Sequence, residues 1–289
     1  MQAPEVITPE LLREWRLPDP AGSKRARGQV IVVGGAARTP GGVALAGLGS
    51  LRVGAGHVQL ALAGSVAPSM AAAFPEAGVL SLPETDGGSI RGTAAAEVLS
   101  EAVADADAVL IGPGLDDAAE AADLLVALLP QVRRDAGLVL DAYALGALSR
   151  SQEAADALMQ RDLSTVLTPN SQELGLLAGN DEPGEDDVPD VAERYRSCVT
   201  SLSTVASSSR RVWRIPQGHA GLATAGSGDV LAGLVVGVLG RGADPGQAAC
   251  WGTYLHSTAG ERLSSAVGGI GFLARELVDQ VPSVLAELG

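Results

Sequence analysis

Short aliphatic runs alternate along the chain with longer segments in which apolar positions recur at helical spacing. The runs predict buried strands at residues 29–33, 57–63, 108–111, 138–140 and 166–167. The segments between them predict helices at residues 42–53, 94–104 and 118–129. Strands that alternate with helices in this way indicate an α/β fold, with a central mostly parallel sheet and helices on both faces.

Capping residues and composition define three further segments. Thr8 followed by Pro9 predicts the start of a helix that ends near Leu17. The acidic residues and prolines of residues 180–190 predict a solvated loop, and the Ser/Thr-rich residues 197–211 predict irregular or weak β structure. Because we find no internal repeat and no long linker, we expect the 289 residues to form a single domain.

Four of the expected strands end in groups that are able to contact a ligand. These groups are Gly34-Gly35, Gly112-Pro113-Gly114, Asp141 and Thr168-Pro169-Asn170. In parallel α/β sheets, ligands bind beyond the carboxyl ends of the strands. The sequence therefore predicts a binding site at this edge of the sheet.

Charge and cysteine content restrict the partners and the compartment. The formal net charge of −14 argues against a nucleic-acid or anionic-membrane partner, although backbone amides at a helix start still accommodate a small phosphorylated ligand. Cys198 and Cys250 lie far apart in sequence and fit no metal-ligand spacing, which favours a reducing compartment. Residues 1–6 lack the start of a signal peptide, and the apolar run 230–239 is too short to span a bilayer. We expect a cytoplasmic location.

The strongest chemical motif is the glycine-rich segment 221–229, which directly precedes an apolar helix at residues 230–240. A glycine-rich turn at a helix start presents free N–H groups, and the helix dipole adds attraction for an anion. Asp229 at this point is able to accept the proton of a hydroxyl that attacks a phosphoryl group. The alternative is that Asp229 only caps the helix, which a short glycine motif alone favours.

The sequence Thr224-Ala-Gly-Ser-Gly-Asp229-Val-Leu-Ala-Gly resembles the anion-hole signature of ribokinase-like kinases, in the form found in NAD(P)H-hydrate dehydratases. Further segments are similar to that family in order and spacing. They are Val33-Gly-Gly-Ala, Thr39-Pro-Gly-Gly42, Leu51-Arg-Val-Gly-Ala-Gly56, Ile111-Gly-Pro-Gly-Leu115, Val139-Leu-Asp141-Ala-Tyr-Ala-Leu145, Leu167-Thr-Pro-Asn-Ser-Gln-Glu173, Tyr254-Leu-His256-Ser-Thr-Ala-Gly260 and Gly271-Phe-Leu-Ala-Arg-Glu276.

The resemblance implies ADP-dependent dehydration of the (S)-hydrate of NADH or NADPH, which releases AMP and phosphate. It implies that Asp229 is the catalytic base and that Thr224, Gly226, Ser227 and Gly228 form the anion hole and nucleotide contact. The residues implied for the hydrated dinucleotide are Gly42, Gly114, Asp141, Asn170 and Glu173. Thr204 stands in for a nucleotide-binding threonine. Mg²⁺ is the expected cofactor, with ligands that the sequence does not identify, and the family favours a homo-oligomer, often a tetramer.

Several of these residues also have a purely structural interpretation. Gly114 is able to form a tight turn, and Asn170 is able to cap a helix with Glu173 in a capping box. Asp141 either binds a loop or contacts the ligand, and His256 more often packs in a core than takes part in catalysis.

The chain departs from the family's pattern in its nucleotide-binding segment. Residues 198–206 lack the usual Lys-Gly pair, and Lys24 is the only lysine in the sequence. Arg210 and Arg211 are candidates to reach the nucleotide phosphates instead, although a guanidinium does not simply replace an ammonium group. Tyr143 occupies the place of a second aspartate, and Asn170 that of a histidine. Two alternatives therefore remain: a small-molecule kinase of the same superfamily, and a nucleotide-binding protein with impaired catalysis.

Overall fold

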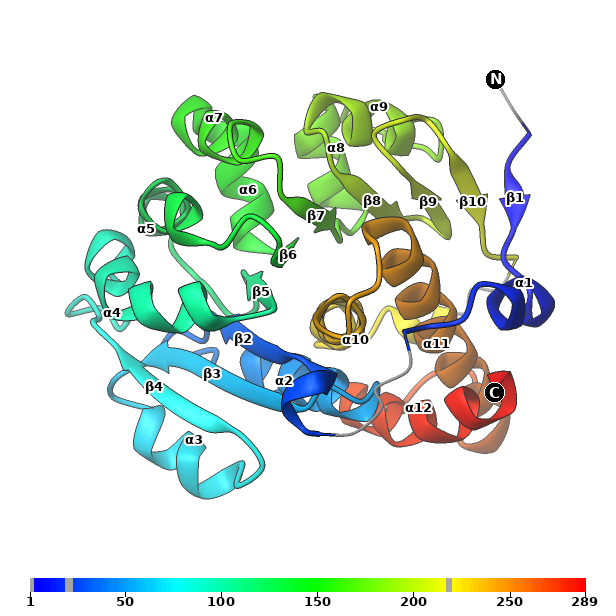
Figure 1. Ribbon diagram of the computed structural model, residues 1–289, viewed down its shortest axis with the longest axis horizontal. Helices are drawn as coiled ribbons and strands as arrows, with labels where there is room; N and C mark the ends of the chain where they lie inside the picture. The colour runs from blue at the N-terminus through cyan, green and yellow to red at the C-terminus, as the bar shows by residue number, and fades with distance from the viewer. Residues whose placement is uncertain (1–2, 19–22, 217–219) are drawn as a thin grey trace.

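In the computed structural model, which describes residues 3–18, 23–216 and 220–289, one ten-stranded sheet runs through the molecule (Figure 1). The strand order is β1-β10-β9-β8-β7-β6-β5-β2-β3-β4, and β9 is antiparallel to both of its neighbours. The strands are β1 Glu5–Val6, β2 Gln29–Val33, β3 His57–Ala63, β4 Gly78–Leu82, β5 Ala108–Ile111, β6 Gly137–Leu140, β7 Ser164–Leu167, β8 Cys198–Ser201, β9 Thr204–Ala206 and β10 Val212–Arg214.

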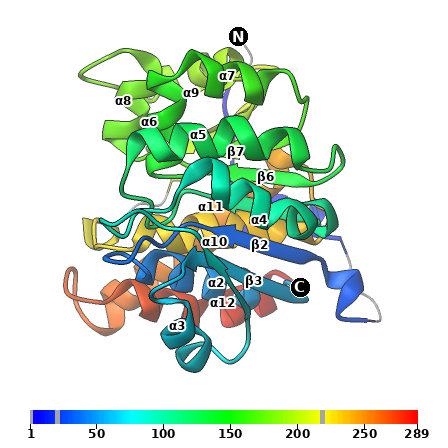
Figure 2. The ribbon, with the colours of Figure 1, turned by 90° about the vertical axis from the view of Figure 1, so that its left-hand side faces the viewer.

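Helices cover both faces of this sheet (Figure 2). On one face lie α1 Pro9–Glu14, α2 Gly41–Arg52, α3 Ala67–Ala73, α10 Ser227–Gly240, α11 Pro245–Ala266 and α12 Ala274–Leu288. On the other lie α4 Gly92–Asp105, α5 Ala118–Leu128, α6 Tyr143–Arg150, α7 Gln152–Met159, α8 Ser171–Ala178 and α9 Asp187–Arg194. Short 3₁₀ turns, η1 Arg25–Arg27, η2 Leu129–Gln131 and η3 Ala220–Leu222, complete the described elements.

Successive strand residues divide between two hydrophobic cores. Val30 and Val32 of β2 belong to the core beneath α2, α10 and α11, whereas Ile31 and Val33 belong to the core beneath α4 and α5. This alternation is the two-residue period of a strand whose faces are both covered. The continuous aliphatic runs of the sequence follow directly from this burial on both faces.

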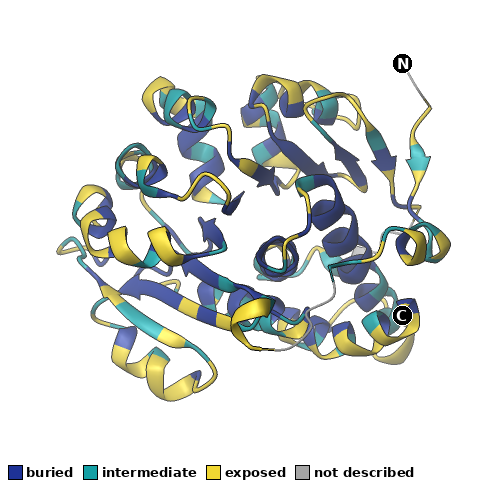
Figure 3. Ribbon diagram, viewed as in Figure 1, coloured by how far each residue is buried: buried dark blue, intermediate teal, exposed yellow. Residues whose placement is uncertain are grey.

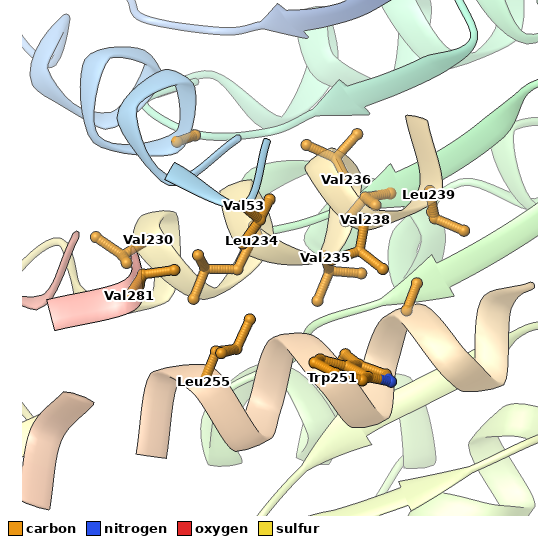
Figure 4. Packing of buried hydrophobic residues seen from close by; sticks show 14 of the residues in the cluster. Val53, Val230, Leu234, Val235, Val236, Val238, Leu239, Trp251, Leu255 and Val281 are labelled. Atoms are coloured by element: carbon orange, nitrogen blue, oxygen red, sulfur yellow. The ribbon is translucent and has the colours of Figure 1, made fainter. Parts of the chain in front are cut away.

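Helix α10 lies at the centre of the first core. It is apolar around its whole circumference, and the sheet curves around it and α11 (Figures 1 and 3). Figure 4 shows its aliphatic side chains between α2, α11 and α12. A β-carbon on Gly233 would lie 2.2 Å from the Ala46 carbonyl oxygen, so the backbones of α2 and α10 are in direct contact. Ser50 Oγ donates to the Gly233 carbonyl oxygen over 2.9 Å and links the same two helices.

The predicted α/β class and the mostly parallel sheet with helices on both faces are confirmed, and β2, β3 and β5 have the predicted bounds. The first helix ends at Glu14, before the predicted Leu17, since Trp15 already leaves the helical conformation. The predicted acidic loop is partly wrong, because residues 187–190 form the first turn of α9, with Asp187 and Asp190 near its positive end. Residues 197–211 contain β8 and β9, in agreement with β structure there.

Strands β1, β4 and β10 and helices α3, α6, α7 and α12 have no counterpart among the predicted elements. Both cysteines are buried and unbridged. In the part of the chain that the structure describes, no helix combines the length and apolar character needed to cross a membrane.

Candidate active site

The four strand ends predicted to contact a ligand are neighbours in space, because β7, β6, β5 and β2 are consecutive in the sheet. Gly35 N–H donates to the Pro113 carbonyl oxygen and Ala36 N–H to that of Gly114, each over 2.8 Å. Gly112 has a φ of +136°, and a β-carbon there would lie 1.8 Å from the Asp141 carbonyl oxygen. Because glycine has no β-carbon, the loop after β6 is able to pack directly against the loop after β5. The loops after β2, β5 and β6 therefore form one closely packed surface.

Helices α2 and α10 begin at this same surface. A β-carbon built on Gly42 would lie 3.0 Å from the Gly114 nitrogen and 3.1 Å from Asp229 Oδ1. The structure thus brings together three residues that lie far apart in sequence. Thr39 Oγ1 donates to the Gly114 carbonyl oxygen over 2.7 Å and fixes the loop between β2 and α2, a contact that no sequence motif indicates.

The glycine-rich segment forms the start of α10. Gly226 is its N-cap with a left-handed φ of 87°, and Ser227 N–H donates to the Thr224 carbonyl oxygen over 3.1 Å. Gly228 is exposed, and no atom lies within 4 Å of where its β-carbon would be. The N–H groups of Gly228 and Asp229 belong to the first helical turn, in which the helix itself supplies no acceptor. This geometry suits a phosphate that approaches the backbone closely.

Asp229 is the third residue of α10 and does not cap the helix, because Gly226 holds the cap position and makes no side-chain capping bond. The Asp229 carboxyl group is half-buried. Its burial, together with the nearby charge of Glu173, raises its pKa from 3.8 to about 6. Asp229 is therefore mostly ionised at neutral pH and remains basic enough to accept a proton.

Asp141 is buried at the end of β6, where its Oδ1 accepts a hydrogen bond from Thr168 Oγ1 over 2.8 Å. Burial, and then the charges of Glu173 and Asp229, raise its pKa to about 8. The next residue, Ala142, has φ 51° and ψ −123°, a conformation that an alanine adopts only under strain. Asp141 thus binds its neighbouring loop, as one interpretation of the sequence held, and also lies within electrostatic reach of Asp229.

Asn170 and Glu173 form the capping box that the sequence offered as an alternative. Asn170 Oδ1 accepts from the Glu173 N–H over 3.0 Å, and Glu173 Oε2 accepts from the Asn170 N–H over 2.9 Å. Burial raises the pKa of Glu173, and its charge contributes to the pKa shifts of both aspartates. The capping role is established by geometry, while substrate contact by Asn170 and Glu173 stays a prediction.

The β8–β9 hairpin lies at the same edge of the sheet, since β8 is parallel to β7. Its two-residue turn joins Ser201 to Thr204, which are cross-strand partners. Both hydroxyl groups are buried, and neither finds a hydrogen-bond partner among the described residues. Buried polar atoms are normally satisfied, so these two oxygens are available to a polar ligand. Ser201 was not a predicted site residue, because nothing in a serine-rich stretch singles it out.

Arg210 and Arg211, the candidates to replace the missing lysine, have other partners. Arg210 forms ion pairs with Asp190 and Glu193 at 2.9 and 2.5 Å. Arg211 pairs with Glu5 at 2.9 Å and lies over the Trp213 ring, 4.6 Å from its centroid. In this structure both guanidinium groups are held by these carboxylates, and a nucleotide contact by Arg210 or Arg211 stays a prediction.

His256 of α11 is buried, and its Nε2 lies 2.8 Å from Ser227 Oγ and 3.0 Å from the Ser227 carbonyl oxygen. Burial lowers its pKa to about 4, so the ring is neutral. The expectation of a packed core histidine is correct as far as burial goes. Its direct contact with a residue of the glycine-rich loop was not foreseen.

Among the described residues, no group of three or more His, Cys, Asp or Glu side chains is arranged to hold a metal ion by itself. Mg²⁺ commonly keeps several waters and binds through one or two carboxylates together with substrate phosphates. The pKa values of Asp229 and Glu173 are shifted without any contribution from an arginine or lysine. Such uncompensated oxygen donors, beside a helix start whose geometry suits a phosphate, fit Mg²⁺ held jointly with a nucleotide.

Comparison with known proteins identifies this arrangement. The sequence profile of the family described as NAD(P)H-hydrate dehydratase matches residues 30–283. The chain belongs to the NAD(P)H-hydrate dehydratase family. It is 43% identical over its whole length to the ADP-dependent (S)-NAD(P)H-hydrate dehydratase of Xanthomonas campestris pv. campestris, covering 99% of that protein.

Solved structures agree with this membership. The fold of the chain matches the ADP/ATP-dependent NAD(P)H-hydrate dehydratase of Bacillus subtilis, co-crystallised with ATP/Mg²⁺, with a TM-score of 0.82, 25% identity and full coverage of both chains. A ribokinase-like superfamily protein from Enterococcus faecalis matches with a TM-score of 0.81 and 22% identity, over 100% of this chain and 98% of that one. This NAD(P)H-hydrate dehydratase family member therefore has the ribokinase-like fold.

Proposed function

We propose that the chain is an ADP-dependent lyase that dehydrates the (S)-hydrate of NADH or NADPH. The full-length similarity to a dehydratase of that activity supports the reaction. The observation that carries the proposal is the position of Asp229, half-buried in the first turn of α10, with its Oδ1 3.1 Å from the β-carbon position of Gly42, which in turn lies 3.0 Å from the Gly114 nitrogen. One carboxylate thereby faces both a phosphate-binding loop and the loops at the strand ends.

In the proposed reaction, the hydroxyl of the hydrated nicotinamide ring attacks the β-phosphoryl group of ADP, and AMP leaves. Asp229 accepts the hydroxyl proton as the new P–O bond forms. Phosphate then departs from the ring carbon as the adjacent carbon loses a proton, which restores the ring double bond. Because such transfer depends on positioning and on charge stabilisation, the rigid loop surface serves catalysis directly.

The anion loop, defined as residues 224–228, holds the transferred phosphoryl group in this proposal. Its Gly228 N–H points from a helix start, and the absence of a side chain there admits the phosphate. Ser227 adds a hydroxyl. Thr224 fixes the turn through its carbonyl oxygen, which accepts from Ser227 N–H. We assign Thr204, with Ser201 beside it, to the nucleotide, because their buried hydroxyl groups lack partners among the described residues.

On the same proposal, Gly42, Gly114, Asp141, Asn170 and Glu173 line the dinucleotide site. The assignment of Gly42 and Gly114 is supported by their proximity to Asp229. The assignment of Asp141 and Glu173 is supported by the electrostatic coupling of their carboxyl groups to Asp229. Asn170 is assigned through its reciprocal bonds with Glu173. When bound, Mg²⁺ supplies charge neutralisation for phosphoryl transfer, and Asp229 and Glu173 are the carboxylates placed to hold it with the nucleotide.

Residues 1–289 act as a single catalytic domain in this proposal, built on one sheet. We further propose a homo-oligomer, with a tetramer as the expected form, acting in the cytoplasm. Two buried, unbridged cysteines and a substrate that forms from a cytoplasmic cofactor support the location.

The proposal is tested by mixing the protein with hydrated NADH, Mg²⁺ and ADP and following absorbance at the reduced-nicotinamide band. We expect recovery that requires ADP, releases AMP and phosphate, and is lost in Asp229→Asn. Asp86→Asn is the matched control, since it removes an exposed carboxylate from the loop between β4 and α4 without touching α10. Recovery that is unchanged in Asp229→Asn would overturn the assignment.

Two other outcomes identify the alternatives. Phosphorylation of a small alcohol by ATP, without recovery of NADH, would indicate a ribokinase-like kinase. Tight binding of ADP without any turnover would indicate a nucleotide-binding protein, consistent with the missing Lys-Gly pair in residues 198–206.

A further inference from the structure

The polar side chains of α11 make two buried contacts with the segments that surround the nucleotide. Thr200 Oγ1 of β8 and Thr253 Oγ1 lie 2.7 Å apart, and His256 Nε2 lies 2.8 Å from Ser227 Oγ. Thr253 and His256 are three residues apart and share one face of the helix. A single rigid helix thus contacts both the β8–β9 hairpin and the anion loop.

The geometry at His256 fixes which atom carries the proton. The carbonyl oxygen of Ser227 accepts hydrogen bonds only, and it lies 3.0 Å from Nε2. If Nε2 were unprotonated, its lone pair would face a lone pair of the Ser227 carbonyl oxygen, which is repulsive. We therefore infer that Nε2 carries the hydrogen. Ser227 Oγ, at 2.8 Å from the same nitrogen, then accepts from this shared N–H. Its own hydrogen is not used in the contact with His256.

We propose that His256 is a positioning residue for the anion loop, whose Nε2–H holds both oxygens of Ser227 and leaves the Ser227 hydroxyl hydrogen to donate to the transferred phosphoryl group. This inference rests on the proposed phosphoryl transfer. His256 is 7% exposed, and it lies beside the positive end of the α10 dipole, where a charged ring is disfavoured. A ring that stays neutral keeps this hydrogen-bond pattern across the working pH range.

The first test compares His256→Leu with His256→Gln, whose amide N–H is able to take the place of Nε2–H. We expect Leu to lower kcat about 100-fold, as loss of one oriented donor in such a site typically does. Gln keeps the donor and should restore kcat to within about tenfold of the wild type. The matched control is Thr258→Val on the same helix, whose buried hydroxyl has no partner among the described residues, and it should leave kcat unchanged.

A double-mutant cycle separates positioning from general support of the fold. In a Ser227→Ala background the hydroxyl is absent, so His256→Leu should lower kcat by less than about threefold. The same 100-fold loss in both backgrounds would overturn the proposal, because His256 would then act independently of the hydroxyl. Equal kcat values for the wild type and His256→Leu would overturn it as well.

The second test needs no turnover and does not depend on the Leu variant folding. Nitrogen NMR of the imidazole, assigned with His256→Gln, should show a neutral ring protonated on Nε2 from pH 6 to 9. A ring protonated on Nδ1, or charged in this range, would overturn the inference. If the ring is as expected but the wild type shows no ADP-dependent recovery of NADH, the proposed function fails, and the two failures are thus distinguished.

Discussion

The two aspartate carboxyl groups of the site differ in protonation although they lie within electrostatic reach of one another. Asp229 has a pKa of about 6 and Asp141 a pKa of about 8, both raised first by burial. At pH 7 Asp229 is therefore largely ionised and Asp141 largely protonated. Environments that separate two pKa values in this way define a base and a neutral hydrogen-bond donor within one site.

This separation predicts a bell-shaped pH profile for kcat/KM. Activity should fall about tenfold per pH unit below pH 6, because protonated Asp229 accepts no proton. It should fall again above pH 8 as Asp141 ionises beside Asp229. Steady-state kinetics with the hydrate from pH 5 to 10 measure both limbs.

The control for the pH profile is Asp141→Asn, which should remove the alkaline limb and keep the acid limb. If activity fell only near pH 4, the ordinary pKa of an aspartate, Asp229 would not be the partly buried base proposed here.

Asp141 also links stability to pH. Its folded pKa, about 8, lies above the unfolded value of 3.8, so ionisation favours the unfolded chain. The resulting loss of stability is absent below about pH 4, grows as pH rises and is complete above about pH 8. Asp141→Asn keeps an acceptor for Thr168 Oγ1 and removes this ionisation.

We therefore expect Asp141→Asn to be more stable than the wild type by roughly 2–5 kcal/mol at pH 8 and by much less at pH 5. Thermal or urea unfolding at the two pH values measures the difference. The exposed Asp86→Asn variant controls for net charge and should show no pH-dependent gain. An equal effect of Asp141→Asn at both pH values would exclude titration of Asp141 as the cause.

At the scale of elements, the contact between α2 and α10 positions Gly42 beside Asp229. Gly233 has the Ala46 carbonyl oxygen 2.2 Å from its β-carbon position. Gly233→Ala should therefore separate the two helices and destabilise the fold by about 2–4 kcal/mol, with loss of activity. Chemical unfolding and the dehydration assay report the two effects.

The matched control for Gly233 is Gly146 of α6, which has no atom within 4 Å of its β-carbon position. Gly146→Ala should stabilise the protein by about 0.5–1 kcal/mol through the lower entropy of the unfolded chain. A Gly233→Ala variant as stable as Gly146→Ala would show that α2 and α10 have room to adjust.

For the β8–β9 hairpin, we predict a substitution that lowers ADP affinity without lowering the free energy of unfolding. Thr204→Val removes a buried hydroxyl without a partner among the described residues, so unfolding free energy should stay equal or rise by up to about 1 kcal/mol. ADP affinity should fall about tenfold, because the nucleotide loses a hydrogen bond there. Unfolding curves and calorimetric titration with ADP measure the two quantities.

Thr200→Val is the counterpart, since it breaks the bond to Thr253 Oγ1 and should lower stability. Unchanged ADP affinity in Thr204→Val would remove Thr204 from the nucleotide site.

Elements with a strong local signal were predictable from the sequence. Strands β2, β3 and β5 are continuous or alternating apolar runs in the sequence. The capping box of α8 depends only on Asn170 and Glu173, which lie three residues apart. Strands β1 and β10 are only two and three residues long, and their pairing depends on distant segments. Short segments of this kind carry too little periodicity to be recognised.

The same distinction applies to the site. The loops at the strand ends and the start of α10 follow from glycines, helix geometry and the order of the elements. The partners of Arg210, Arg211 and His256 depend on which side chains the fold brings together across long sequence separations. The buried hydroxyl of Ser201 is equally invisible in a Ser/Thr-rich segment.

At the scale of the whole molecule, the excess of acidic over basic residues conflicts with the binding of an anionic nucleotide. The chain carries 34 Asp and Glu residues against 20 Lys and Arg. Many of its cations are already paired with carboxylates in the described structure; these are Arg13, Arg52, Arg133, Arg210, Arg211, Arg214 and Arg262. Attraction for ADP must therefore come from short-range backbone donors and Mg²⁺ rather than from the long-range field.

This origin of affinity predicts an unusual response to salt. Raising NaCl from 25 to 300 mM screens the repulsion between ADP and the acidic protein, so Mg²⁺-free ADP should bind equally well or roughly two- to fivefold more tightly. Adenosine, which shares the base and ribose but carries no charge, should bind independently of salt. Titration calorimetry of both ligands at several salt concentrations makes the comparison. A steep loss of ADP affinity with salt would instead indicate that a cationic side chain binds the phosphates.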